Sequence, residues 1–127
     1  MITLSEKIQA VRDYIAEHGW NQGYYWADDG RGACIRGAAI SALSAFGEFS
    51  SGEVREFLTE QIRQMGLGWK WIQNPCGDWA VVDPEMYLSG NFLSREPVAL
   101  YNDEVLKSKE EALAFLDKAR IAAEEMA

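Results

Sequence analysis

The chain has few of the side chains on which most enzyme chemistry depends. Its 127 residues include one histidine, His18, and two cysteines, Cys34 and Cys76. No Cys/His cluster has the spacing of a zinc site, and a single imidazole leaves at most one histidine base for catalysis. In a reducing compartment, two cysteines favour free thiols over a disulfide. We therefore expect no metal centre and no cofactor.

Long apolar runs and an excess of basic residues are also absent. No stretch reaches the roughly 18 apolar residues of a membrane span, and the N-terminus lacks the basic-then-apolar pattern of a signal peptide. Twelve basic residues stand against twenty acidic ones, which gives a net charge of −8. That balance disfavours contacts with nucleic-acid phosphates. The sequence predicts a cytoplasmic protein that binds neither membranes nor phosphate backbones directly.

What the chain does have is apolar periodicity. Hydrophobic residues make up 48% of it, and one domain over residues 1–127 fits this length. Residues 3–17, 33–46, about 50–65 and 108–126 show the 3.6-residue period of helices. Thr3, Ser50 and Ser108 each precede a Glu by three residues, the spacing of a capping box. The segment 33–46 is small or apolar almost all round, so we expect it to be a buried central helix.

Residues 69–82 have a different pattern. Two runs rich in β-forming residues flank the turn sequence Asn-Pro-Cys-Gly at 74–77, which predicts a short β-hairpin. A period of two puts Trp69 and Trp71 on one face, with Trp79 as a candidate for the same face. From 83 to 97 we expect loops, with at most a turn of helix near 85–88. The predicted fold is mainly α, with four helices in a single domain and this hairpin inserted before the last helix.

Three motifs in order resemble a known family. They are Gly-Trp-Asn-Gln-Gly at 19–23, Cys-Ile-Arg-Gly-Ala at 34–38 and Tyr-Asn-Asp at 101–103, the last followed by Ser108 and a helix. The chain is similar in these positions to an uncharacterised domain family of actinobacteria and their phages. The likeness covers about residues 1–47 and 98–124. It implies a shared fold and a phage-borne or host-accessory origin, and the family has no established activity.

The chain departs from the family pattern at three positions. Asn21 stands where many relatives carry Cys, Ala39 replaces the usual Leu of the core motif, and His18 stands where relatives often have Asn. The last departure argues against a family-wide role for the imidazole.

Cys34 is the sharpest candidate for catalysis. A thiol at a helix N-terminus has a lowered pKa, and cysteine hydrolases pair such a thiol with a histidine base and an Asn or Asp that orients it. Here the base would be His18, and the orienting residue would be Asn102 or Asp103. Small side chains continue the flank of Cys34 along its helix, however, so we favour a packing role for it. Asn102 and Asp103 would more simply tie down a loop by hydrogen bonds to the backbone.

The aromatic segments at 20–26 and 69–79 are the better candidates for binding. Together they carry more aromatic surface than one small core readily covers, and Trp and Tyr are favoured at interfaces. We expect a small non-enzymatic binding or regulatory protein that acts through a protein partner or self-association. The alternatives are a cysteine-dependent hydrolase or transferase and an acidic mimic of nucleic acid. The predicted binding residues are Trp20, Gln22, Tyr24, Tyr25, Trp26, Trp69, Trp71, Trp79 and Asn102.

Overall fold

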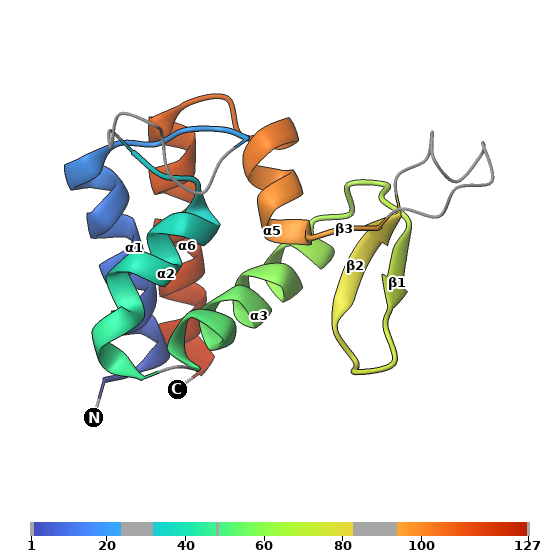
Figure 1. Ribbon diagram of the computed structural model, residues 1–127, viewed down its shortest axis with the longest axis horizontal. Coiled ribbons are helices and arrows are strands. Elements are labelled where there is room, and N and C mark those ends of the chain that lie inside the picture. Colours follow the sequence, from blue (N-terminus) through green and yellow to red (C-terminus); the bar gives the residue numbers. More distant parts are fainter. Residues whose placement is uncertain (1, 24–31, 48, 83–93, 127) are drawn as a thin grey trace.

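The computed structural model describes residues 2–23, 32–47, 49–82 and 94–126, and it is mainly helical, as predicted (Figure 1). No helix in these ranges is long and apolar enough to cross a membrane. The elements in chain order are α1 (Leu4–His18), α2 (Ile35–Leu43), the 3₁₀ turn η1 (Ser44–Phe46), α3 (Ser50–Arg63), β1 (Trp71–Gln73), β2 (Trp79–Val82), β3 (Ser94–Arg95), α5 (Pro97–Leu100), the π-helix η2 (Tyr101–Val105) and α6 (Lys109–Met126).

Helices α1 and α6 form the most extensive pair in the bundle. They run antiparallel, so both chain ends lie at the same end of the molecule (Figure 1). Arg12 donates from Nε to Asp117 Oδ1 over 3.1 Å across this pair. Helix α2 packs on α1, and α3 packs on α2. The fully buried side chains between them are aliphatic and include Ile8, Ile15, Ile35, Leu43, Leu58, Ile62 and Leu116.

Local capping explains where two of the long helices begin. The Thr3 side chain accepts from Glu6 N, and Glu6 bonds back to Thr3 N, which is the predicted capping box. Ser108 Oγ accepts from Glu111 N over 3.1 Å at the start of α6. The third prediction is wrong: Ser50 lies inside α3, and its hydroxyl donates to Phe46 O because the chain enters this helix through η1.

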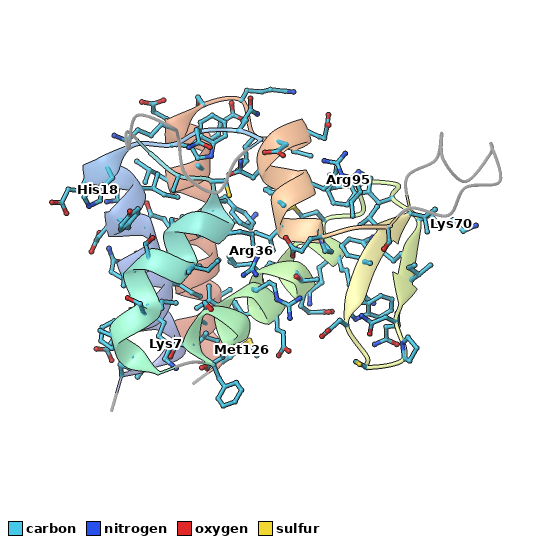
Figure 2. The ribbon with its side chains drawn as sticks, in the orientation of Figure 1. Lys7, His18, Arg36, Lys70, Arg95 and Met126 are labelled. Carbon is cyan, nitrogen blue, oxygen red and sulfur yellow. The ribbon has the colours of Figure 1, made fainter. Side chains whose placement is uncertain are left out.

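The predicted central helix is shorter than 33–46 and surfaces at its end. Cys34 is its N-cap, α2 stops at Leu43, and the 3₁₀ turn that follows is exposed, with Phe46 45% accessible. The first two turns are buried because α1, α3 and α5 pack around them. Arg36, the one charge in this helix, lies 3.8 Å from Glu96 at the start of α5 (Figure 2).

The strands form one antiparallel sheet in the order β1-β2-β3, beside α3 and α5 (Figure 1). At the turn between β1 and β2, Asn74 Oδ1 accepts from the amides of Cys76 and Asp78. Two expectations for the next segment are wrong. Residues 94–95 form a third strand rather than a loop, and Pro97 begins α5, where its missing N–H costs nothing. The turn expected at 85–88 lies outside the described residues.

Candidate functional site

Asn102 is a fully buried polar side chain, and it lies on a π-helix. Leu106 N donates to Tyr101 O, five residues back, which gives η2 its wider turn. The Asn102 Oδ1 atom accepts from Trp20 Nε1 at 2.7 Å and from Ile35 N at 3.2 Å. Its Nδ2 donates to Asn21 O and to Asp103 Oδ1. The amide thereby uses both its donors and both its acceptor positions, which is what burial of such a group requires.

Gln22 and Asp103 extend this network toward the surface. Gln22 Nε2 lies 2.9 to 3.2 Å from the carbonyl oxygens of Asn102, Asp103 and Leu106, so it satisfies the end of η2. Asp103 Oδ1 also accepts from Gly23 N at 2.8 Å. We call Trp20, Gln22, Asn102 and Asp103 the Asn102 network. It joins two of the predicted motifs, which lie about eighty residues apart in the chain.

The same network fixes the chain on either side of residues 24–31. Trp20 and Ala33 form a parallel bridge, with Asn21 N donating to Ala33 O. Gly32 has a φ of +116°, and a Cβ there would come within 2.9 Å of the Gly19 carbonyl carbon, so only glycine fits. The predicted binding residues Tyr24, Tyr25 and Trp26 lie outside the described residues.

Cys34 is positioned as a cap rather than as a nucleophile. Its side chain is almost fully buried, and Sγ accepts from Gly37 N at 3.4 Å. Burial raises the pKa of this thiol, and the nearby Asp103 charge raises it further, against the lowering effect of the Gly37 and Arg36 amides and the Arg36 charge. The thiolate is the reactive form, so the environment suppresses reactivity.

His18 stands apart from this thiol. It is half-exposed at the end of α1, stacks on Tyr14 with ring centroids 4.3 Å apart, and lies 4.0 Å from Glu17. Figure 2 shows it at the outer edge of the bundle. The Asp103 carboxylate accepts hydrogen bonds from Gly23 N and Asn102 Nδ2. Within the ranges that the structure describes, no hydrogen bond joins His18 to Cys34 or Asp103, so the catalytic constellation considered from sequence is not assembled.

The three tryptophans of the sheet region form one cluster. The rings of Trp69 and Trp71 are 5.9 Å apart, and those of Trp71 and Trp79 are 6.3 Å apart in an edge-to-face arrangement. The guanidinium of Arg63, on α3, lies 3.9 Å from the Trp79 ring centroid, a cation–π contact. All three indoles are half-buried, and Trp69 and Trp71 also pack against the main core. The cluster therefore attaches the sheet to the helices and still presents aromatic surface.

Strand β1 is an edge of the sheet as far as the described residues extend. Lys70 O accepts from Val82 N, Ile72 pairs with Ala80, and Asn74 N donates to Asp78 O. Hydrogen-bonded pairs alternate with non-bonded ones along an antiparallel ladder. The N–H and C=O groups of Trp71 and Gln73 consequently point away from β2, toward the open edge.

A cleft of about 300 Å³ separates α3 from the turn between β1 and β2. Arg55 Nη2 faces Asp78 Oδ1 across it at 3.7 Å, and Trp79 and the exposed Cys76 line the sheet side. No local pattern in the sequence points to this cleft, because Arg55 and Asp78 belong to separate elements that only the fold brings together. The described residues contain no group of three His, Cys, Asp or Glu side chains that could hold a metal ion.

Comparison with known proteins adds the family. The model of a family of unknown function, DUF6197, matches residues 1–122. The chain belongs to that family. Membership of DUF6197 confirms the prediction of an uncharacterised domain family, and all three predicted motifs lie within the matched residues. No curated protein and no solved structure matches the chain.

Proposed function

We propose that this DUF6197 protein is a non-enzymatic binding protein that holds a protein partner on its three-stranded sheet. The observation that carries the proposal is the edge of β1, which no further strand covers among the described residues and where the main-chain groups of Trp71 and Gln73 point away from β2 beside half-buried tryptophans. An extended segment can add to such an edge as a further strand, since unpaired main-chain donors and acceptors supply affinity. The neighbouring indoles would supply contact area and selectivity.

We give the Asn102 network a positioning role rather than a direct part in binding. The polar groups of Trp20, Gln22 and Asn102 are bonded within the chain, so we assign them to holding segment 20–23 in place. Tyr24, Tyr25 and Trp26 follow directly, and we include them as a second part of the contact surface on sequence grounds alone.

Two observations weigh against the alternatives. A buried thiol with a raised pKa forms little of the thiolate that a cysteine hydrolase needs as its nucleophile. An acidic mimic needs a face of one sign, whereas ion pairs such as Lys7–Glu53 and Arg12–Asp117 place basic side chains among the acidic ones on the described helices. The resemblance to actinobacterial and phage proteins supports the biological setting that we propose, a phage-encoded protein that acts in the host cytoplasm.

A substitution at the open edge tests the function. Gln73→Pro removes an outward N–H without breaking the ladder to β2, whereas Gln73→Thr keeps that N–H and favours a strand. Host proteins that co-purify with the wild type would be quantified by mass spectrometry, and oligomeric state would be measured by sedimentation. We expect the proline variant to lose the partner, or the self-association, that the threonine variant keeps.

Circular dichroism and tryptophan fluorescence would verify that both variants fold. If folded Gln73→Pro retains every partner and the same oligomeric state as Gln73→Thr, the β1 edge is not the contact surface and the proposal is wrong.

A further inference from the structure

A second set of exposed apolar side chains belongs to the end of the bundle where α1 begins and α6 ends, away from the sheet (Figure 1). Of the six large hydrophobic side chains that are exposed in the described ranges, three belong to this end: Phe46 at 45%, Phe49 at 80% and Met126 at 74%. The contact of Lys7 with Glu53 at 2.6 Å holds the start of α3 against α1, and Ser5 bonded to Glu124 holds the end of α6 there. Figure 2 places Lys7 and Met126 together at this end.

The surface includes a groove. Between the start of α1 and the end of α6 lies an opening of about 490 Å³, whose apolar lining residues are Leu4, Ala123 and Met126. We call these residues, together with the exposed Phe46 and Phe49 at the same end of the bundle, the terminal patch. Large exposed apolar areas on a soluble protein mark interaction sites.

The rim of the terminal patch is acidic. Glu6 and Glu124 line the groove, and Glu125, the next residue of α6, is exposed. Two ion pairs are close by: Lys7 offsets Glu53, and Arg120 offsets Glu124 at 2.9 Å, so the charges of Glu6 and Glu125 are in excess. The last turn of α6, described as far as Met126, carries no basic residue, and the negative end of its helix dipole adds to this excess. The groove therefore favours a cationic occupant.

We propose that the terminal patch binds a basic amphipathic helix of a partner protein. Its apolar face would fill the groove against Leu4 and Met126, and its Lys or Arg residues would meet the acidic rim and the end of α6. A second copy of this chain would bring one acidic rim against another, so charge disfavours self-association here. Anionic lipid is disfavoured for the same reason. The protein would then join two partners, one at each surface, and this site does not depend on the one proposed at β1.

The probe is a fluorescein-labelled synthetic helix of leucine and lysine with one apolar face, titrated with the full chain and followed by anisotropy. The matched probe has every lysine replaced by glutamate. We expect the lysine peptide to bind and the glutamate peptide not to bind. The double variant Phe49→Ser, Met126→Ser should weaken binding at least about tenfold, the loss typical of removing an interface anchor. Ile121→Ser changes an exposed apolar residue of α6 outside the groove and should leave binding unchanged.

Equal weakening by Ile121→Ser and the double variant would show non-specific attraction to an acidic protein and overturn the proposal. So would a dimer that the double variant abolishes, since the occupant would then be a second copy. Binding of the wild type, but not of the double variant, to phosphatidylserine vesicles would overturn it in favour of a membrane surface. Thermal unfolding verifies that both variants fold. Gln73→Pro, which should abolish binding of a partner at the β1 edge, should leave binding of the lysine peptide unchanged.

Discussion

At the scale of single residues, Cys34 shows how position reverses a familiar expectation. A thiol at the start of a helix usually gains acidity from the helix dipole. Here burial outweighs the two backbone amides that favour the thiolate, and the nearby Asp103 carboxylate acts in the same direction as burial. The side chain serves instead as the N-cap of α2, a role more often filled by Ser, Thr, Asp or Asn.

This leads to a prediction about alkaline stability. Because folding raises the pKa of Cys34 above its ordinary value of 9.0, the folded chain holds the thiol proton more tightly than the unfolded chain does. The resulting stability is complete below that value and is lost as pH rises toward the folded pKa, at up to about 1.4 kcal/mol per pH unit. Cys34→Ser replaces the capping sulfur with a hydroxyl oxygen and removes the titrating thiol. Urea unfolding should show that the wild type loses more unfolding free energy between pH 7 and pH 9.5 than Cys34→Ser does.

Equal losses in the two proteins would mean that the thiol is not the group responsible. Tyr101, whose pKa burial also raises from 10.0, adds its own loss at higher pH in both proteins, so it does not affect the comparison.

At the scale of elements, η2 is the feature that organises the upper end of the bundle. Its wide turn places Asn102 where it bonds both to Trp20 and Asn21, just after α1, and to the first amide of α2. A regular helix through the same residues would carry that side chain to a different face, since each residue would turn by a larger angle. The π-helix therefore joins three segments by one amide.

Asn102→Leu tests this arrangement. It leaves Trp20 Nε1, Ile35 N and Asn21 O without their partner, so we expect a loss of about 4 kcal/mol in unfolding free energy. Trp20→Phe removes only one donor and leaves Ile35 N bonded to Asn102, so its cost should be about 1 kcal/mol. Urea denaturation measures both. Similar values for the two variants would show that Asn102 does not act as a shared junction.

Local signals in the sequence predict some helix starts correctly and fail where contacts distant in the chain decide the structure. The starts of α1 and α6 were predictable because Thr3 and Ser108 cap the helix from within a few residues. The start of α3 was not, because the tertiary entry through η1 overrides the local signal at Ser50. The motifs at 19–23 and 101–103 stand out in the sequence, but the bond between Trp20 and Asn102 spans a separation that no local pattern encodes.

At the scale of the whole molecule, Arg63 is one of the described side chains that connect the helices to the sheet. Its guanidinium lies over Trp79 and within 5.8 Å of Trp71, and it is 3.7 Å from Glu60 on its own helix. The terminal patch and the β1 edge lie on either side of this connection (Figure 1). The contact of Arg63 with the tryptophans therefore helps to hold the two surfaces in a fixed relative position.

Arg63→Met keeps much of the aliphatic contact and removes the charge, so the attachment of the sheet should weaken by about 1 kcal/mol. We expect amide hydrogen exchange to rise in β1 and β2, with little change in α1 and α6. Arg95→Met, on β3, is the matched control because its guanidinium only approaches Glu104 at 3.9 Å. An equal rise in every helix would mean that Arg63 stabilises the fold as a whole.

The turn between β1 and β2 has a practical consequence. It presents Cys76 at the surface, whereas the other thiol of the chain is packed inside. A maleimide reagent would therefore attach to the wild-type protein at one place. Immobilised on a bead through that sulfur, every molecule would be held at the same point, the turn of its sheet. One bond would thus give all copies a single orientation.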